Sequence, residues 1–168
     1  MMALTGFTKR CARRSGGIRT IVLMEADKVT AVYDAATDGY TSASAPEGNR
    51  ADYSFNEDEA QLRETVSVAG GSLSVTHELS FSLARMDAAS RKAVEEMATA
   101  SYCGLVALVT TNNGERLLVG YSPQFGAERP LRVSKCVGMS GQKLSDPTSE
   151  SVTLVSTDTQ KARSVAAE

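Results

Sequence analysis

The sequence is short of the side chains on which most catalytic and metal sites depend. Its 168 residues include one histidine, three cysteines and no tryptophan. One histidine cannot supply the paired imidazole ligands of a typical zinc site. Cys11, Cys103 and Cys136 are odd in number and far apart, which excludes a disulfide framework and a Cys-x-x-Cys site. We therefore expect three reduced thiols, two of them in the core.

A large charge of one sign and long apolar runs are also missing. Lys and Arg number 18 against 20 Asp and Glu, a net charge of −2, which excludes a broadly basic surface for nucleic acid. No run approaches the roughly 18 apolar residues of a membrane span, so no membrane insertion is expected. The basic first 20 residues lack the apolar stretch of a signal peptide, so we expect a protein kept in the reducing cytosol.

Alternation of side chains is the clearest pattern that is present. From Leu73 to Leu83, apolar side chains and His77 take the odd positions, and Ser, Thr or Glu take the even ones. A second alternating run precedes it, and Gly70-Gly71 lies between the two. This pattern predicts a long β-hairpin over Gln61–Leu83. At about 3.3 Å per residue its second strand extends roughly 36 Å, so the hairpin is expected to project beyond the body.

The rest of the chain favours strands over helices. Residues 87–101 form the only convincing helix, with Asp87 as its N-terminal cap. Short apolar runs of strand length follow one another elsewhere, at 18–26, 29–33, 105–109, 117–121, 131–139 and 152–155. We predict a mainly β fold, a two-sheet β-sandwich or barrel with one flanking α-helix and the long hairpin. It would span residues 18–156, with a basic N-terminal arm (1–17), an extended loop (34–50) and a polar C-terminal tail (157–168).

The sequence contains no motif that predicts a catalytic site. His77 lies on the apolar face of its strand, where a buried histidine held by a neighbour is the simpler interpretation. Residues 138–142 resemble a nucleophile elbow, but Gln142 occupies the final glycine position. Walker and dinucleotide-binding loops are missing, and an acidic run at 57–59 is more typical of a solvated loop. The sequence therefore predicts no enzyme, no cofactor and no metal site.

Blocks of opposite charge suggest contacts between copies of the chain. Residues 1–20 carry a charge of +5 and residues 51–64 a charge of −4. Such separation suits association, and the alternative is unrelated solvated surface. A long hairpin also leaves sheet edges exposed, and joining the hairpins of neighbouring subunits into a closed barrel would remove them. The candidate contact residues, between subunits or between rings, are Lys9, Arg10, Arg13, Arg14, Glu57, Asp58 and Glu59.

The order of these elements is similar to that of a known virion family. The residues that carry the similarity are 55–59 before the hairpin 61–83, the helix 87–101, the strand 104–109, the Asn113-Gly114 turn with its return at 118–120, and the closing segments 138–141, Asp146 and 152–154. Together they resemble phage tail tube proteins. In that family a β-sandwich with a flanking helix and a long hairpin forms rings, usually hexamers, which stack into a tube through which the genome passes.

The resemblance implies partners and a location. The partners would be ring neighbours and stacked rings of the same chain, together with tape-measure, tail terminator and baseplate proteins. The location would be the virion tail, after synthesis in the host cytoplasm. DNA would pass without specific binding, because neutral or acidic walls do not grip phosphate. Hydroxyl and acidic side chains of the hairpin are the candidate lumen wall: Ser72, Ser74, Thr76, Glu78, Ser80, Ser82 and Glu64. Which hairpin face would line the lumen stays open.

Other functions also stay open. One alternative is that the chain is another ring component of a tail or injection machine, such as a terminator or baseplate protein. A tube subunit stacks without limit, whereas an end ring stops. A monomeric β-barrel binding module would instead need a pocket with convergent polar groups, and a hydrolase would need a site that the motifs do not indicate. If the tube interpretation holds, deletion of residues 1–14 leaves a folded subunit that assembles poorly.

Overall fold

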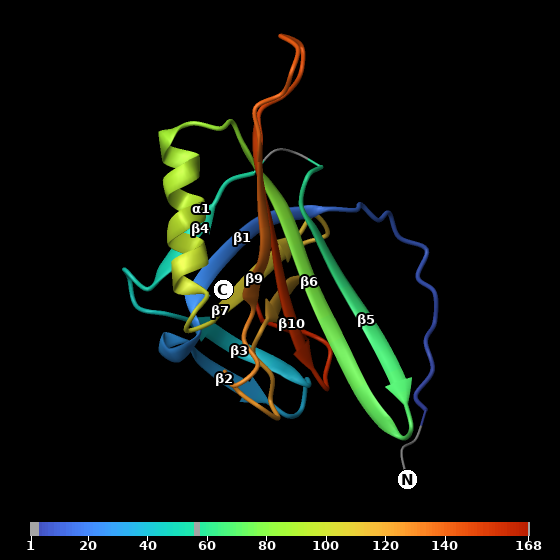
Figure 1. Cartoon of the computed structure of the whole chain (residues 1–168). Helices are drawn as coiled ribbons and strands as arrows, with labels where there is room; N and C mark the ends of the chain where they lie inside the picture. Colours follow the sequence, from blue (N-terminus) through green and yellow to red (C-terminus); the bar gives the residue numbers. More distant parts are fainter. Residues whose placement is uncertain (1–3, 56–57, 168) are drawn as a thin grey trace.

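Two facing β-sheets and a small outer hairpin contain most of the chain, as seen in a computed structural model that describes residues 4–55 and 58–167 (Figure 1). The first sheet has the strand order β11-β8-β7-β1-β4, the second sheet has the order β5-β6-β10-β9, and β2 pairs with β3 alone. The bounds are β1 (Ile18–Glu25), a 3-10 turn (Ala26–Lys28), β2 (Thr30–Asp34), β3 (Gly39–Ser44), β4 (Arg50–Tyr53), β5 (Gln61–Ala69), β6 (Ser72–Ala84), α1 (Ala88–Ala100), β7 (Leu105–Thr111), β8 (Arg116–Val119), β9 (Arg132–Met139), β10 (Ser149–Asp158) and β11 (Arg163–Ser164).

The main core lies between the two sheets and is closed by α1. Phe81 and Leu79 of β6 meet Ile21 of β1 there, and Val94 and Met97 of α1 pack into the same cluster. The helix begins where the sequence predicts, because the Asp87 carboxylate accepts a 2.9 Å hydrogen bond from the backbone N–H of Ser90. The predicted mainly β class, the flanking helix and the long hairpin are confirmed, in an open sandwich of two sheets.

The first sheet is buried on both faces at β7. Val106 and Leu108 of β7 point away from the main core into a second cluster, where Tyr40 of β3 covers them. Double burial explains why residues 105–109 are a continuous apolar run without alternation. The predicted extended loop over 34–50 is wrong, because this segment contains β3, which pairs with β2 to form the covering hairpin. The strand escaped prediction because its Gly, Ser, Thr and Ala residues have turn-like composition.

The C-terminal segment is also better ordered than the sequence indicated. β10 continues to Asp158, and the chain then returns as β11 to pair with β8 at the edge of the first sheet. Val165 is buried, and the backbone N–H of Ala166 donates to the Tyr40 carbonyl oxygen at 2.8 Å. The polar tail over 157–168, which the sequence left without a place, is thus attached to the body as far as Ala166 by an apolar side chain and backbone pairing.

The cysteines are not where the sequence placed them. Cys11 and Cys103 are exposed and Cys136 is half-buried. The expectation of two core thiols is wrong, because Cys11 lies on the exposed arm and Cys103 follows the end of α1 at the surface. All three are free thiols, as expected.

Candidate assembly surface

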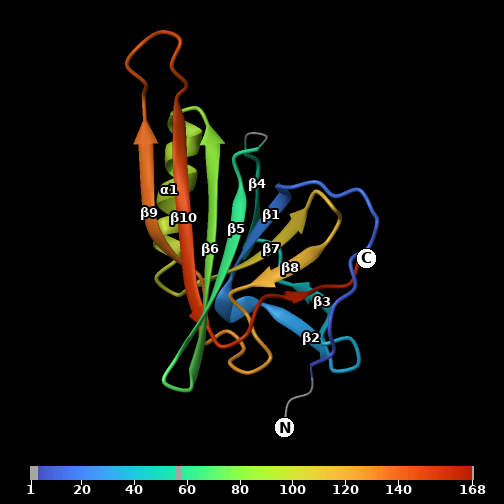
Figure 2. The same ribbon diagram turned by 90° about the vertical axis from the view of Figure 1, so that its right-hand side faces the viewer.

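The outer face of the second sheet presents hydroxyl side chains from three adjacent strands. Figure 2 looks onto this face, with β9, β10, β6 and β5 side by side and α1 behind them. Cross-strand pairs place Thr65 beside Thr76 and Ser82 beside Ser151, and the last two hydroxyl oxygens lie 3.1 Å apart. No helix or strand of the described chain covers the face in this view. The even-numbered residues of the long strand lie on it: Ser72, Ser74, Thr76, Glu78, Ser80 and Ser82.

Neighbouring strands add positive charge to this face. Arg63 of β5 is directly opposite Glu78, and Lys135 of β9 is directly opposite Thr153 of β10. β6 taken alone has one acid and no base, as the sequence indicated. The assembled face instead has a mixture of both signs, which only the strand order reveals.

Glu64 does not belong to this face. It pairs in register with His77 and shares the inner side of the sheet with it. Its Oε2 atom lies 3.2 Å from His77 Nδ1 and accepts a 2.9 Å hydrogen bond from the backbone N–H of Ala162. The assignment of Glu64 to the same wall as Ser72–Ser82 is therefore wrong. Even-numbered residues of β5 pair with odd-numbered residues of β6, so their side chains lie on the opposite side of the sheet from the even-numbered residues of β6.

The buried pair of Glu64 and His77 fastens the hairpin to the chain that follows β10. His77 Nε2 donates to the Gln160 carbonyl oxygen at 3.1 Å, and the ring is almost fully buried. Burial raises the pKa of the Glu64 carboxyl, but the contact with His77, the Ala162 N–H and the charge of Lys161 outweigh it, so the pKa lies below its ordinary 4.5. The interpretation of His77 as a structural histidine held by neighbours is confirmed.

The second sheet has two unpaired edges and two projecting ends. β5 and β9 are its outermost strands, so each has one backbone edge without a strand partner in the described chain. β10 pairs with β6 only from Val75 to Ala84, so the β5–β6 turn extends beyond it. Figures 1 and 2 both show this turn at the lower end of the molecule and the β9–β10 turn at the upper end.

Both projecting ends carry exposed apolar side chains. At the β5–β6 end, Val66, Val68 and Leu73 are exposed. At the β9–β10 end, Met139 is more than half exposed and Leu144 fully so. The turn around Leu144 is held by the Asp146 carboxylate, which accepts 3.0 Å hydrogen bonds from the backbone N–H groups of residues 142 and 143. Those bonds lower the pKa of Asp146.

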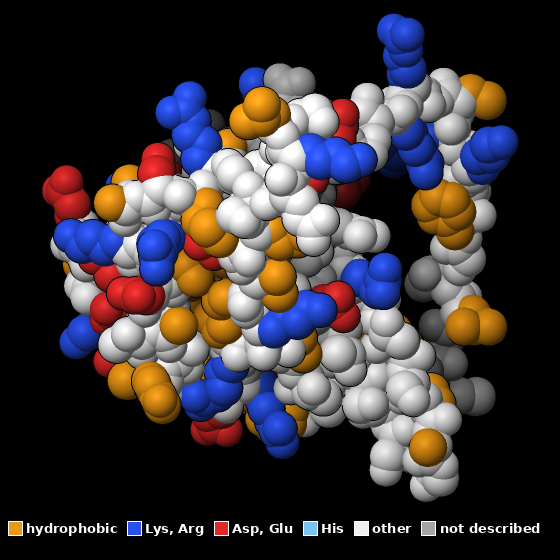
Figure 3. All heavy atoms as spheres, turned by 45° about the horizontal axis from the view of Figure 1, so that its top comes forward, with side chains coloured by type: hydrophobic (Ala, Val, Ile, Leu, Met, Phe, Trp, Pro, Cys, Tyr) orange, Lys and Arg blue, Asp and Glu red, His pale blue; other side chains and the backbone are white. Residues whose placement is uncertain are grey.

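Hydrogen bonds hold the base of the N-terminal arm to the β7–β8 turn. Asn113 exchanges two hydrogen bonds with the Ser15 backbone, and the Asn112 amide donates to the Gly16 carbonyl oxygen at 2.7 Å. Residues 4–14 have no helix or strand and are exposed. Figure 3 shows this segment standing away from the body with Lys and Arg side chains along it. The predicted contact residues Lys9, Arg10, Arg13 and Arg14 all lie there.

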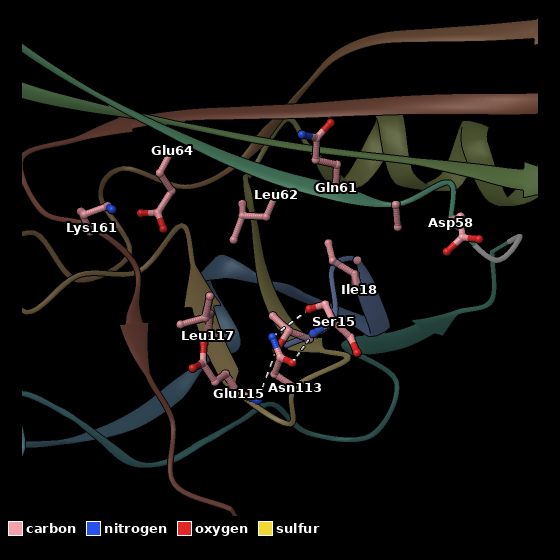
Figure 4. A pocket seen from close by; sticks show the side chains of 13 residues that line it. Ser15, Ile18, Asp58, Gln61, Leu62, Glu64, Asn113, Glu115, Leu117 and Lys161 are labelled. Atoms are coloured by element: carbon pink, nitrogen blue, oxygen red, sulfur yellow. Dashed lines mark hydrogen bonds between the residues drawn. The ribbon is translucent and has the colours of Figure 1, made fainter. Parts of the chain in front are cut away.

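One of the acidic candidates lies close to the base of the arm. Asp58 lines one groove together with Ser15 and Glu64, shown in Figure 4. Glu59 is exposed, and Glu57 lies outside the described residues. The sequence had not singled out Glu115, which the β7–β8 turn adds to the same groove. No local sequence signal connects Glu115 with Asp58, because 57 positions separate them in the chain.

Comparison of the chain with models of known protein families, with curated protein sequences and with solved structures found no match. Among the described residues, no group of three or more His, Cys, Asp or Glu side chains is arranged to hold a metal ion. The one described helix of three or more turns is too short and too polar to cross a membrane.

Proposed function

We propose that the protein is a structural, self-assembling virion subunit that forms the stacked rings of a phage tail tube. One observation carries the proposal. The second sheet has an uncovered hydroxyl-rich face, two unpaired lateral edges and two apolar ends that point in opposite directions. The edges and the ends would each be met by another copy of the same chain, and the hydroxyl-rich face would stay open.

The lateral edges support ring formation. Pairing of β5 of one copy with β9 of the next would extend the second sheet from subunit to subunit and satisfy the backbone groups that are free in one copy. Repetition of one head-to-tail contact closes a ring when the rotation closes. The resemblance to tail tube proteins makes six copies the expected number.

The projecting ends support stacking. A ring built this way would present the β9–β10 turns on one rim and the β5–β6 turns on the other. Leu144 and Met139 on one side and Val66, Val68 and Leu73 on the other would be removed from water when two rings meet. The two rims differ, so every ring would stack in the same orientation, and the stack would always keep a free rim for the next ring.

The outer face of the second sheet is then the wall of the tube. Hydroxyl groups dominate it, with two cations, Arg63 and Lys135, against the one acid Glu78, a small surplus of +1 per copy among these residues. A wall of this kind holds phosphate weakly, which suits passage of DNA without specific binding. In this proposal the protein needs no catalytic group, and its further partners would be the tape-measure, terminator and baseplate proteins of a virion tail.

Electron microscopy of the purified full-length chain tests the proposal. Negative-stain images and mass photometry over rising protein concentration should give rings and then stacked tubes with a central hole. Rings that never stack would instead identify an end component. Particles of 17.8 kDa at every concentration would contradict self-assembly.

A further inference from the structure

A groove of about 690 Å³ lies between β5 and the turn that joins β7 to β8. Its floor is apolar, formed by Ile18, Leu62 and Leu117, and its walls are charged (Figure 4). Among the described residues, three carboxylates line it, those of Asp58, Glu64 and Glu115, against one cation, that of Lys161. The groove therefore combines an apolar floor with an excess of negative charge.

Two of these carboxylates are available to a ligand. Glu64 is already engaged by His77 and Ala162. Asp58 and Glu115 make no ion pair with any described residue. They come from elements far apart in the chain, so only the fold brings them to one groove.

The arm has the complementary chemistry. Residues 4–14 carry four cations and no acid, and none of the four forms an ion pair within the described residues. The same segment holds Leu4 and Phe7, both almost fully exposed to water. The apolar side chains and the four cations of the arm complement the apolar floor and the acidic walls of the groove. This complementarity makes the arm the segment that the groove is best suited to bind.

We propose that the groove receives the N-terminal arm of a second copy of the chain. Residues 4–14 of the same copy do not line the groove. Ser15 is fixed at the groove wall, and Phe7, Arg10 and Arg14 lie at a separate hollow on the other side, which they share with Glu115. A second copy can bring its arm in extended, and each copy then gives one arm and receives one.

This contact rests on the proposed assembly and adds the site that holds neighbouring copies together. Charge complementarity makes it sensitive to salt, since exposed ion pairs are screened over a Debye length of about 8 Å at physiological ionic strength. The apolar contribution of Leu4 and Phe7 is not screened. Salt should therefore weaken the contact without abolishing it.

Cysteine cross-linking in the full-length chain tests the proposal, with the native Cys11 of the arm as one reactive group. The second group is introduced by Lys161→Cys on the groove wall, in a Cys103→Ser background that removes the other exposed thiol. A short bismaleimide should give covalent dimers and longer chains. The matched control is Lys92→Cys on the exposed side of α1, which should cross-link at least about tenfold less.

Charge reversal gives an independent readout with a rescue. Asp58→Lys with Glu115→Lys should reduce the cross-link between Cys11 and the introduced groove thiol about tenfold or more, because like charges then face each other. Adding Arg13→Glu with Arg14→Glu to the same chain should restore it. A rescue of this kind would not occur if the groove variants had merely misfolded.

Several outcomes would overturn the proposal. The first is a cross-link within one chain, which mass spectrometry of the monomer band would show. The second is equal cross-linking at the Lys92→Cys control. The third is a loss of cross-linking on charge reversal in the groove that the arm variants do not restore. Electron microscopy of the same samples separates this proposal from the tube. Tubes without the cross-link would remove the arm contact and leave the tube standing, whereas cross-linked chains without rings would do the opposite.

Discussion

Replacing the apolar tip of the long hairpin should block assembly without unfolding the subunit. Val66 is 49% and Val68 71% exposed in the single chain, so only a neighbour can bury these exposed fractions. Complete burial of a valine stabilises by about 1.5–3 kcal/mol. In proportion to the exposed fractions, the two side chains together contribute about 2–3.5 kcal/mol to each contact.

The test is the double variant Val66→Thr with Val68→Thr. Threonine keeps the β-branched shape that suits a strand, so the free energy of unfolding of the single chain should change by no more than about 0.5 kcal/mol. The critical concentration for assembly should rise roughly 30- to 300-fold, since about 1.4 kcal/mol corresponds to a factor of ten. Light scattering against concentration, with urea unfolding of the same samples, measures both quantities.

Val32→Thr is the matched control. Val32 is 52% exposed on β2, in the outer hairpin that covers the first sheet and away from the second sheet. This variant should leave the critical concentration within about twofold of the original, because the proposal buries no surface there. If the hairpin variant assembles at the unchanged concentration, or the control is equally impaired, the hairpin tip is not the stacking contact.

Three further predictions concern the single chain. Gly104→Ala and Gly114→Ala should both destabilise the chain in urea unfolding, because both glycines have positive φ. The loss should be about 1–2 kcal/mol for Gly114→Ala and about 2–5 kcal/mol for Gly104→Ala, where the added Cβ would also collide with the ring of Pro130. Glu64→Gln should flatten the loss of stability that sets in as pH falls below the ordinary carboxyl pKa of 4.5. A carboxyl with a lowered pKa stabilises the fold above its unfolded pKa and loses that contribution as pH falls through the folded one, so an unchanged slope in urea unfolding against pH would contradict this. Burial, and to a smaller extent the nearby Glu150, raise the pKa of the Cys136 thiol. Iodoacetamide at about pH 8 should therefore alkylate Cys136 more slowly than the two exposed cysteines, which mass spectrometry can follow. Equal alkylation rates would show that Cys136 is open to solvent.

Local chemistry was sufficient to predict the hairpin and the helix. Strict alternation on both sides of Gly70-Gly71 puts Leu79 and Phe81 on one face of the strand, and both are buried there. Asp87 predicted the start of α1 because an N-terminal cap acts within four residues. The sequence by itself thus determined a mainly β chain with one helix, a hydroxyl-rich strand face and a separation of charge between residues 1–20 and 51–64.

Strand order and long-range contacts were decided only by the tertiary structure. β3 is a strand because the exposed side of β7 must be covered, a need that no property of residues 39–44 displays. Glu64 moved from the expected wall to the inner side because its place follows from cross-strand register with His77. Arg63 lies on the hydroxyl face because it pairs with Glu78, and Glu115 lies near Asp58 because the β7–β8 turn and the segment before β5 line the same groove. Pairing across the sheet, and packing between segments far apart in the chain, are fixed by burial of the whole core and leave no local sign in the sequence.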